Sequence, residues 1–97
     1  MTTDAENDLK AIFRYVTEIL LEPNIARKIY NSIYKKIFAL EYMAKRHKVI
    51  SEISYKPYGI RRIVVSNYSI IYTVNEESQI VMVLRVVYSR RELQGII

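Results

Sequence analysis

The stretch GIRRIVV-SN-YSIIYTV-NEES-QIVMVLRVV, residues 59–87, contains three runs rich in β-branched and aromatic residues, separated by two short polar breaks. Such runs predict three neighbouring antiparallel strands. The first break, Ser66-Asn67, has the two-residue length of a tight β-hairpin, and asparagine tolerates the positive φ that this turn requires. Residues 59–87 are therefore predicted to form a three-stranded antiparallel meander.

Alternation along these runs predicts the two faces of the sheet, because successive side chains of a strand point to opposite sides. One set is almost wholly apolar and is expected to pack against helices: Val64, Ile70, Tyr72, Val74, Met82, Leu84 and Val86. The other set places two arginines among apolar and hydroxyl groups: Arg61, Ile63, Val65, Ser69, Ile71, Thr73, Val81, Val83, Arg85 and Val87. An apolar patch rimmed by polar groups is typical of an interaction surface, so function is expected on this second face.

Two amphipathic helices are predicted before the sheet, between about residues 4 and 44. Apolar residues recur at helical spacing on both sides of Pro23, which is expected to end the first helix. Thr3 with Glu6 resembles a capping box, and Asn24 is a candidate N-cap for the second helix. The short connection makes the two helices an antiparallel hairpin that needs a sheet to cover its apolar stripe.

Composition limits the possible classes. Ninety-seven residues make a single domain (1–97), with the helix hairpin at about 4–44, the sheet at about 59–87 and a tail at 88–97. Cysteine is absent and there is one histidine, which excludes disulfides and thiolate or multi-histidine metal sites. No metal and no cofactor are predicted. No apolar run approaches the roughly 20 residues of a membrane span, so a cytoplasmic protein without a membrane partner is expected.

The net charge of +5 lies in the half of the chain that contains the sheet. Residues 1–44 contain six basic and six acidic side chains, whereas residues 45–97 contain nine basic and four acidic ones. This excess favours a polyanionic partner, either nucleic acid or an acidic protein segment, although solubility alone also explains it. Lys45-Arg46-His47-Lys48 either complements the helix dipole or contacts phosphate. Val49, Ile53 and Tyr55 form either a short strand or an apolar loop.

Three segments, in order, resemble the RelE/ParE superfamily of toxins from bacterial type II toxin-antitoxin, or plasmid stabilisation, systems. They are Gly59-Ile60-Arg61-Arg62, Ser66-Asn67-Tyr68-Ser69-Ile70-Ile71-Tyr72-Thr73-Val74 and Leu84-Arg85-Val86-Val87-Tyr88-Ser89-Arg90-Arg91-Glu92-Leu93. The resemblance implies an α+β fold in which the N-terminal antiparallel helix hairpin packs on one face of a three- to four-stranded antiparallel sheet. It also implies a cognate antitoxin as partner.

The resemblance leaves two activities open: ParE-like members inhibit DNA gyrase, whereas RelE-like members are mRNA interferases that cleave mRNA on the ribosome. RelE-like nucleases place a catalytic arginine where this chain has Ser69, and the Gly59 and Arg85 motifs look closer to ParE. Gyrase inhibition is therefore the first expectation. A rearranged nuclease site of Arg61, Arg85, Tyr88 and Arg90, with His47 or Glu52 as base, is the alternative, and a non-toxic antitoxin-binding member is another.

Binding of antitoxin or target is predicted for a basic set on the second face and the tail. Its members are Arg61, Arg62, Ser69, Arg85, Tyr88, Arg90 and Arg91. Alternatively, Arg61 and Arg62 form surface ion pairs with Glu76, Glu77 or Glu92, which contribute little. Family members usually begin with a strand, but only three residues precede the first predicted helix here. An uncovered sheet edge is therefore expected, with a homodimer or an antitoxin strand to cover it.

Overall fold

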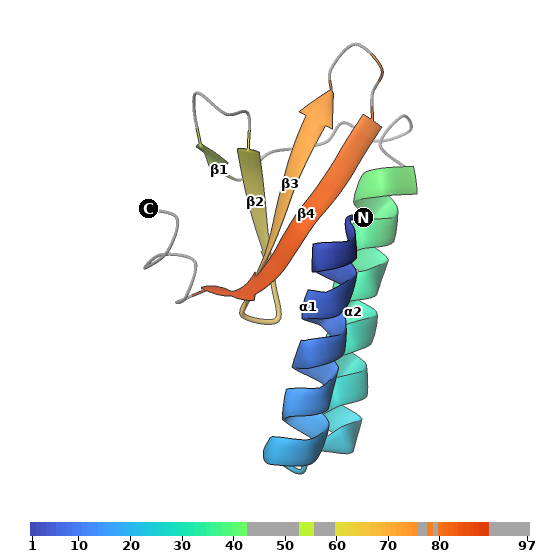
Figure 1. Ribbon diagram of the computed structural model, residues 1–97, viewed down its shortest axis with the longest axis vertical. Helices are drawn as coiled ribbons and strands as arrows, with labels where there is room; N and C mark the ends of the chain where they lie inside the picture. The colour runs from blue at the N-terminus through green and yellow to red at the C-terminus, as the bar shows by residue number, and fades with distance from the viewer. Residues whose placement is uncertain (43–52, 56–59, 76–77, 79, 90–97) are drawn as a thin grey trace.

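The computed structural model describes residues 1–42, 53–55, 60–75, 78 and 80–89. The two helices come first in the chain, and a four-stranded antiparallel sheet follows with its strands in the order β1-β2-β3-β4. The helices lie side by side along one side of the sheet, and their paired far ends extend beyond it (Figure 1). The predicted α+β architecture of a helix hairpin on an antiparallel sheet is thus confirmed.

The first helix starts one residue earlier than predicted. Helix α1 spans Thr3–Arg14 and continues as a π-helical turn, η1, at Tyr15–Ile19. Thr2, not Thr3, is the N-cap, and its hydroxyl accepts a hydrogen bond of 3.1 Å from the Ala5 N–H. The predicted pairing of Thr3 with Glu6 is therefore wrong, because Thr2 already satisfies the first-turn donor.

The second helix, α2, spans Pro23–Tyr42, so that Pro23 begins it and Asn24 is not its N-cap. Proline suits the first helical position because that residue's N–H has no helical partner. Leu21 turns the chain between the helices with a φ of 55°, an unusual value for leucine. None of the helices within the described ranges is long and apolar enough to cross a membrane.

The strands are β1 Ile53–Tyr55, β2 Ile60–Val65, β3 Tyr68–Asn75 and β4 Ile80–Tyr88. The alternative that Ile53 and Tyr55 belong to a short strand is thus the correct one. Ser66 and Asn67 both have positive φ, at 52° and 67°, as a type I′ turn requires. The predicted two-residue hairpin between β2 and β3 is confirmed.

The predicted division of the sheet into two faces is correct for β3, wrong for β2 and partly wrong for β4. Across the two-residue turn Ile63 pairs with Ile70, so odd-numbered residues of β2 share a face with even-numbered residues of β3. In β4 a bulge shifts the register between Ile71 and Tyr72, so that Tyr72 pairs with Val83 while Ile70 pairs with Val86. Val81 and Val83 are consequently buried, whereas Val64 and Met82 are exposed and Leu84 is only half-buried.

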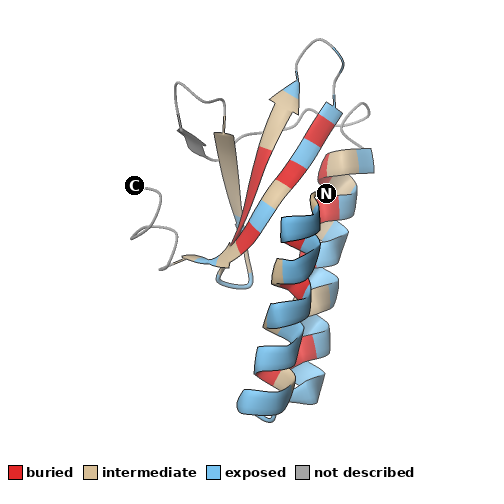
Figure 2. Ribbon diagram, in the orientation of Figure 1, coloured by how far each residue is buried: buried red, intermediate tan, exposed pale blue. Residues whose placement is uncertain are grey.

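The hydrophobic core lies between the helices and this corrected face of the sheet, as the buried segments in Figure 2 show. Its buried members come from α1, α2, β3 and β4: Ala5, Leu9, Ile33, Ile37, Leu40, Ile70, Tyr72, Val81, Val83 and Val86. Tyr72 is fully buried among them, as expected for a tyrosine that serves packing. The far end of the hairpin contributes little, since Ile19, Leu20 and Leu21 are exposed.

Residues at the two helices form hydrogen bonds with the outer edge of β4. The Thr2 N–H donates to the Val83 carbonyl at 3.0 Å, and the Thr2 hydroxyl donates to the Leu84 carbonyl at 2.7 Å. The Val83 N–H donates to Glu41 and the Val86 N–H donates to Asp8, both at 2.9 Å. At these four backbone groups the chain itself supplies the hydrogen-bond partners that a homodimer or an antitoxin strand would otherwise supply.

Candidate functional site

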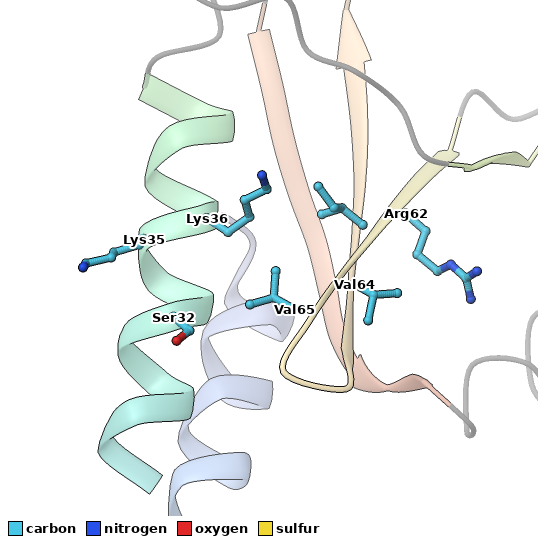
Figure 3. Close-up of a pocket in the computed structure, with 7 residues that line it drawn as sticks. Ser32, Lys35, Lys36, Arg62, Val64 and Val65 are labelled. Atoms are coloured by element: carbon cyan, nitrogen blue, oxygen red, sulfur yellow. The ribbon is translucent and has the colours of Figure 1, made fainter. Parts of the chain in front are cut away.

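A groove of about 690 Å³ separates α2 from the outer part of β2. Its lining combines basic residues with aliphatic ones: Ser32, Lys35, Lys36, Arg62, Ile63, Val64 and Val65. Lys36 reaches from α2 towards the sheet, and Val65 points into the space between sheet and helix (Figure 3). Lys35 points away from the sheet, and Arg62 extends on the other side of β2 (Figure 3). The groove therefore has an apolar floor with cations at its margins.

The predicted pairing of Arg61 with Arg85 on one face is wrong. Arg61 lies opposite Tyr72, whose side chain is in the core, whereas Arg85 lies opposite Ile71 on the other face. Arg62 also lies opposite Ile71. The arginine that shares a cross-strand row with Arg85 is therefore Arg62, because neighbouring residues of β2 point to opposite faces.

Arg85 forms an ion pair with Asp8 of helix α1. Its Nε–H donates to Asp8 Oδ2 at 2.8 Å and an Nη–H donates to Asp8 Oδ1 at 3.0 Å. This hydrogen bonding and the charge of Asp8 raise the pKa of Arg85 above its ordinary value. Asp8 Oδ2 accepts a further hydrogen bond from the Val86 N–H, so the carboxylate joins the helix to the strand.

Ser69 is fully buried and is tied to the end of β4. Its hydroxyl lies 3.1 Å from the Ser89 hydroxyl, which in turn donates to the Asn67 carbonyl at 2.9 Å. The Ser89 N–H donates to the same carbonyl at 3.1 Å. This small network links β4 to the β2–β3 turn and fills the position that carries an arginine in RelE-like nucleases.

Tyr88, the remaining described residue of the predicted site, packs edge-on against Tyr68 with ring centroids 5.7 Å apart. Burial, followed by the nearby Tyr88 and Tyr15, raises the pKa of Tyr68 above its ordinary value of 10.0. The Tyr68 phenol is therefore neutral near pH 7. The other candidates, Arg90, Arg91, His47 and Glu52, and the proposed ion-pair partners Glu76, Glu77 and Glu92, lie outside the described residues.

The residues of the predicted nuclease site are therefore not brought together within the described part of the chain. Arg61 lies on the face of the core, Arg85 is held by Asp8 and Tyr88 packs on Tyr68. Asp8, Glu41 and Lys36 were missed as structural or site residues by sequence reasoning. The hydrogen bonds of Asp8 and Glu41 join residues up to 78 positions apart in the chain, and no local pattern reveals such contacts.

Comparisons with known proteins agree with this description. The sequence model of the ParE toxin of type II toxin-antitoxin systems, parDE, matches residues 1–93. No curated protein matches the chain in sequence. Among solved structures, one described as the chromosomal ParDE TA system from P. aeruginosa is similar, with a TM-score of 0.69. The similarity covers 90% of this chain and 89% of the other, at 21% sequence identity, and shows a shared fold. Since the family match spans nearly the whole chain, the protein belongs to the ParE toxin family of type II toxin-antitoxin systems.

Proposed function

We propose that this toxin inhibits DNA gyrase and is neutralised by a cognate antitoxin, as its ParE relationship implies. The burial and hydrogen bonding of Ser69 are the observation that favours gyrase over mRNA as the target. The position of the nuclease arginine holds a fully buried serine whose hydroxyl is bonded within the fold. A protein that cleaves RNA needs a cation in contact with the reacting phosphate, and Ser69 supplies none.

The ion pair between Arg85 and Asp8 also favours gyrase over mRNA as the target. A guanidinium that already makes two hydrogen bonds to Asp8 must give them up before it can clamp a phosphate. Binding of a protein target does not require such a rearrangement, because Arg85 remains half exposed. Gyrase inhibition places the protein in the cytoplasm, where its target acts.

The test is a supercoiling assay with purified gyrase and relaxed plasmid. The expected result is a dose-dependent loss of supercoiled product, which the protein encoded by the neighbouring reading frame restores. Undiminished supercoiling together with transcript cleavage in a ribosome extract would instead identify an mRNA endonuclease. Unimpaired growth on induction without antitoxin, with neither activity, would identify a non-toxic member of the family.

A further inference from the structure

Four large aliphatic side chains are exposed where the chain passes from the first helix to the second. Ile19 is 65% exposed, Leu20 50%, Leu21 74% and Ile25 47%. This end of the helix hairpin extends beyond the sheet, so the strands do not cover it (Figure 1). We call Ile19, Leu20, Leu21 and Ile25 the apolar tip. Exposed apolar side chains gathered at one end of a molecule, rather than scattered singly, are typical of an interaction site.

The backbone of the apolar tip is held in a defined conformation by the π-helical turn η1. The Leu20 N–H donates to the Tyr15 carbonyl at 3.1 Å, and the Glu22 N–H donates to the Val16 carbonyl at 3.0 Å. Val16 is buried, and η1 packs against α2. Leu21 has a φ of 55°, a left-handed value that costs a leucine free energy. The tip is therefore both fixed in shape and strained.

Packing within the chain does not offset the strain at Leu21, because its side chain is largely exposed. Residues held in rare backbone conformations cluster at binding sites, and π-helical turns are frequent there too. A side chain that is already positioned also loses less conformational entropy when it binds. The apolar tip is thus suited to act as a rigid anchor that enters a recess in a partner.

Glutamates form the inner border of the apolar tip. Glu18 and Glu22 are exposed, and they are the only charged residues from the start of η1 through the first four residues of α2. Among the described residues neither glutamate forms an ion pair. Both lie within three positions of Leu21, whereas the nearest basic residues, Arg14 and Arg27, are six or more positions away. The charge beside the tip is therefore negative, although the protein as a whole carries +5.

This border selects among possible partners. Nucleic acid and the anionic surface of a membrane would be repelled by the glutamates. A second copy of the chain would bring two acidic borders together. Four side chains are also far fewer than the roughly 20 residues that each side of a stable dimer contributes. A protein with an apolar recess bordered by basic side chains fits best.

We propose that the apolar tip anchors this toxin to gyrase by entering an apolar recess bordered by lysine or arginine. This proposal rests on gyrase inhibition as the function of the protein. An enzyme that acts on DNA presents basic side chains to the phosphate backbone, so gyrase offers a border of the required charge. Because the hairpin projects, its end can enter a recess while the sheet stays outside (Figure 1). The contact uses neither Ser69 nor the groove beside β2.

The test compares four variants with the wild type in the supercoiling assay and in binding to immobilised gyrase. Leu21→Asn removes the aliphatic side chain, and asparagine tolerates the left-handed backbone. Its control is Ile80→Asn, since Ile80 is 58% exposed at the start of β4, at the opposite end of the molecule (Figure 1). Glu22→Lys reverses a charge beside the tip, and Glu6→Lys reverses an exposed charge in the first turn of α1. Circular dichroism checks that all four variants fold.

Leu21→Asn is expected to raise the Kd for gyrase and the toxin concentration for half-inhibition by about tenfold or more. Glu22→Lys should raise both by about threefold or more, because it turns attraction to a basic border into repulsion. Ile80→Asn and Glu6→Lys should stay within about twofold of the wild type, since surface changes away from a contact have small effects. The cognate antitoxin should bind Leu21→Asn as tightly as it binds the wild type.

A Leu21→Asn variant that inhibits as well as the wild type would overturn the role of the tip and leave gyrase inhibition standing. A wild type that neither inhibits nor binds gyrase would overturn both. Equal losses in Leu21→Asn and Ile80→Asn would also refute a specific contact at the tip, and an unaffected Glu22→Lys would refute the basic border. Loss of antitoxin binding alone, or a dimer in sedimentation that Leu21→Asn dissociates, would assign the tip to another partner.

Discussion

Ser69 is the residue at which this toxin departs most clearly from a nuclease. Its side chain is fully buried on β3, and its hydroxyl has a partner in Ser89. This position is thus buried within the fold and supplies no cation to a substrate phosphate. Gyrase inhibition and the absence of an arginine here are consistent with each other, because binding a protein target requires no phosphate clamp at this position.

Replacing Ser69 by arginine tests this interpretation directly. Ser69→Arg is expected to destabilise the fold by about 3 kcal/mol or more, because it buries a charge with no partner. It should confer no transcript cleavage in a ribosome extract. Ser69→Ala is the control and should cost about 1 kcal/mol, the value of one hydrogen bond. Urea unfolding measures both, and a stable Ser69→Arg variant that cleaves mRNA would contradict the reading.

Tyr68 predicts how stability depends on alkaline pH. Burial raises the pKa of its phenol in the folded state, so the folded protein holds this proton more tightly than the unfolded chain. The resulting stabilisation is fully present below about pH 10 and is lost as pH rises through the folded-state pKa. Urea unfolding at pH 9 and pH 11 should show a smaller loss for Tyr68→Phe than for the wild type.

At the scale of elements, the connection between the two helices stores strain. Leu21 has a φ of 55° and is 74% exposed, so its side chain gains little from packing to offset the left-handed backbone. Leu21→Gly is expected to stabilise the protein by about 1 kcal/mol, because glycine adopts this conformation without cost. Leu20, with a φ of −86°, is the control, and Leu20→Gly should destabilise. Thermal unfolding measures the stability of both variants. A Leu21→Gly variant less stable than Leu20→Gly would show that the Leu21 backbone is not strained.

The β4 bulge is the second element that matters, because it decides which residues of that strand reach the core. Before the bulge Val81 and Val83 face the helices, and after it Val86 does. The same irregularity leaves Leu84 half-buried and turns Arg85 towards α1. One inserted residue therefore couples core packing to the position of a candidate binding residue.

At the scale of the whole molecule, carboxylates fasten the helices to the sheet. Asp8 from α1 and Glu41 from α2 accept hydrogen bonds from backbone N–H groups of β4, in place of a neighbouring strand. The contacts connect residues up to 78 positions apart. They let a sheet edge meet helices with its backbone groups satisfied, which a purely apolar interface would not allow.

The Asp8 contacts give a prediction about this interface. Asp8→Ala leaves the Val86 N–H without its acceptor and should cost about 1 to 3 kcal/mol. Arg85→Ala removes only the half-exposed ion pair and should cost about 1 kcal/mol or less. In a double-mutant cycle measured by urea unfolding, the double variant should match Asp8→Ala closely. Equal costs for the two single variants would show that the backbone contact contributes nothing.

The sequence by itself determined the order of the two helices and of strands β2, β3 and β4, the turn at Ser66-Asn67 and the relationship to RelE/ParE toxins, because these depend on local periodicity and on motifs. It left β1 open between a strand and a loop. It did not determine the faces of β2 and β4. The face on which each residue of β2 and β4 lies depends on strand pairing across the two-residue turn and on the β4 bulge. Each of these changes by one residue which positions share a face with the even-numbered residues of β3. Nor could it place Asp8 beside Arg85 or Glu41 beside Val83, because tertiary packing alone brings distant segments within hydrogen-bonding distance.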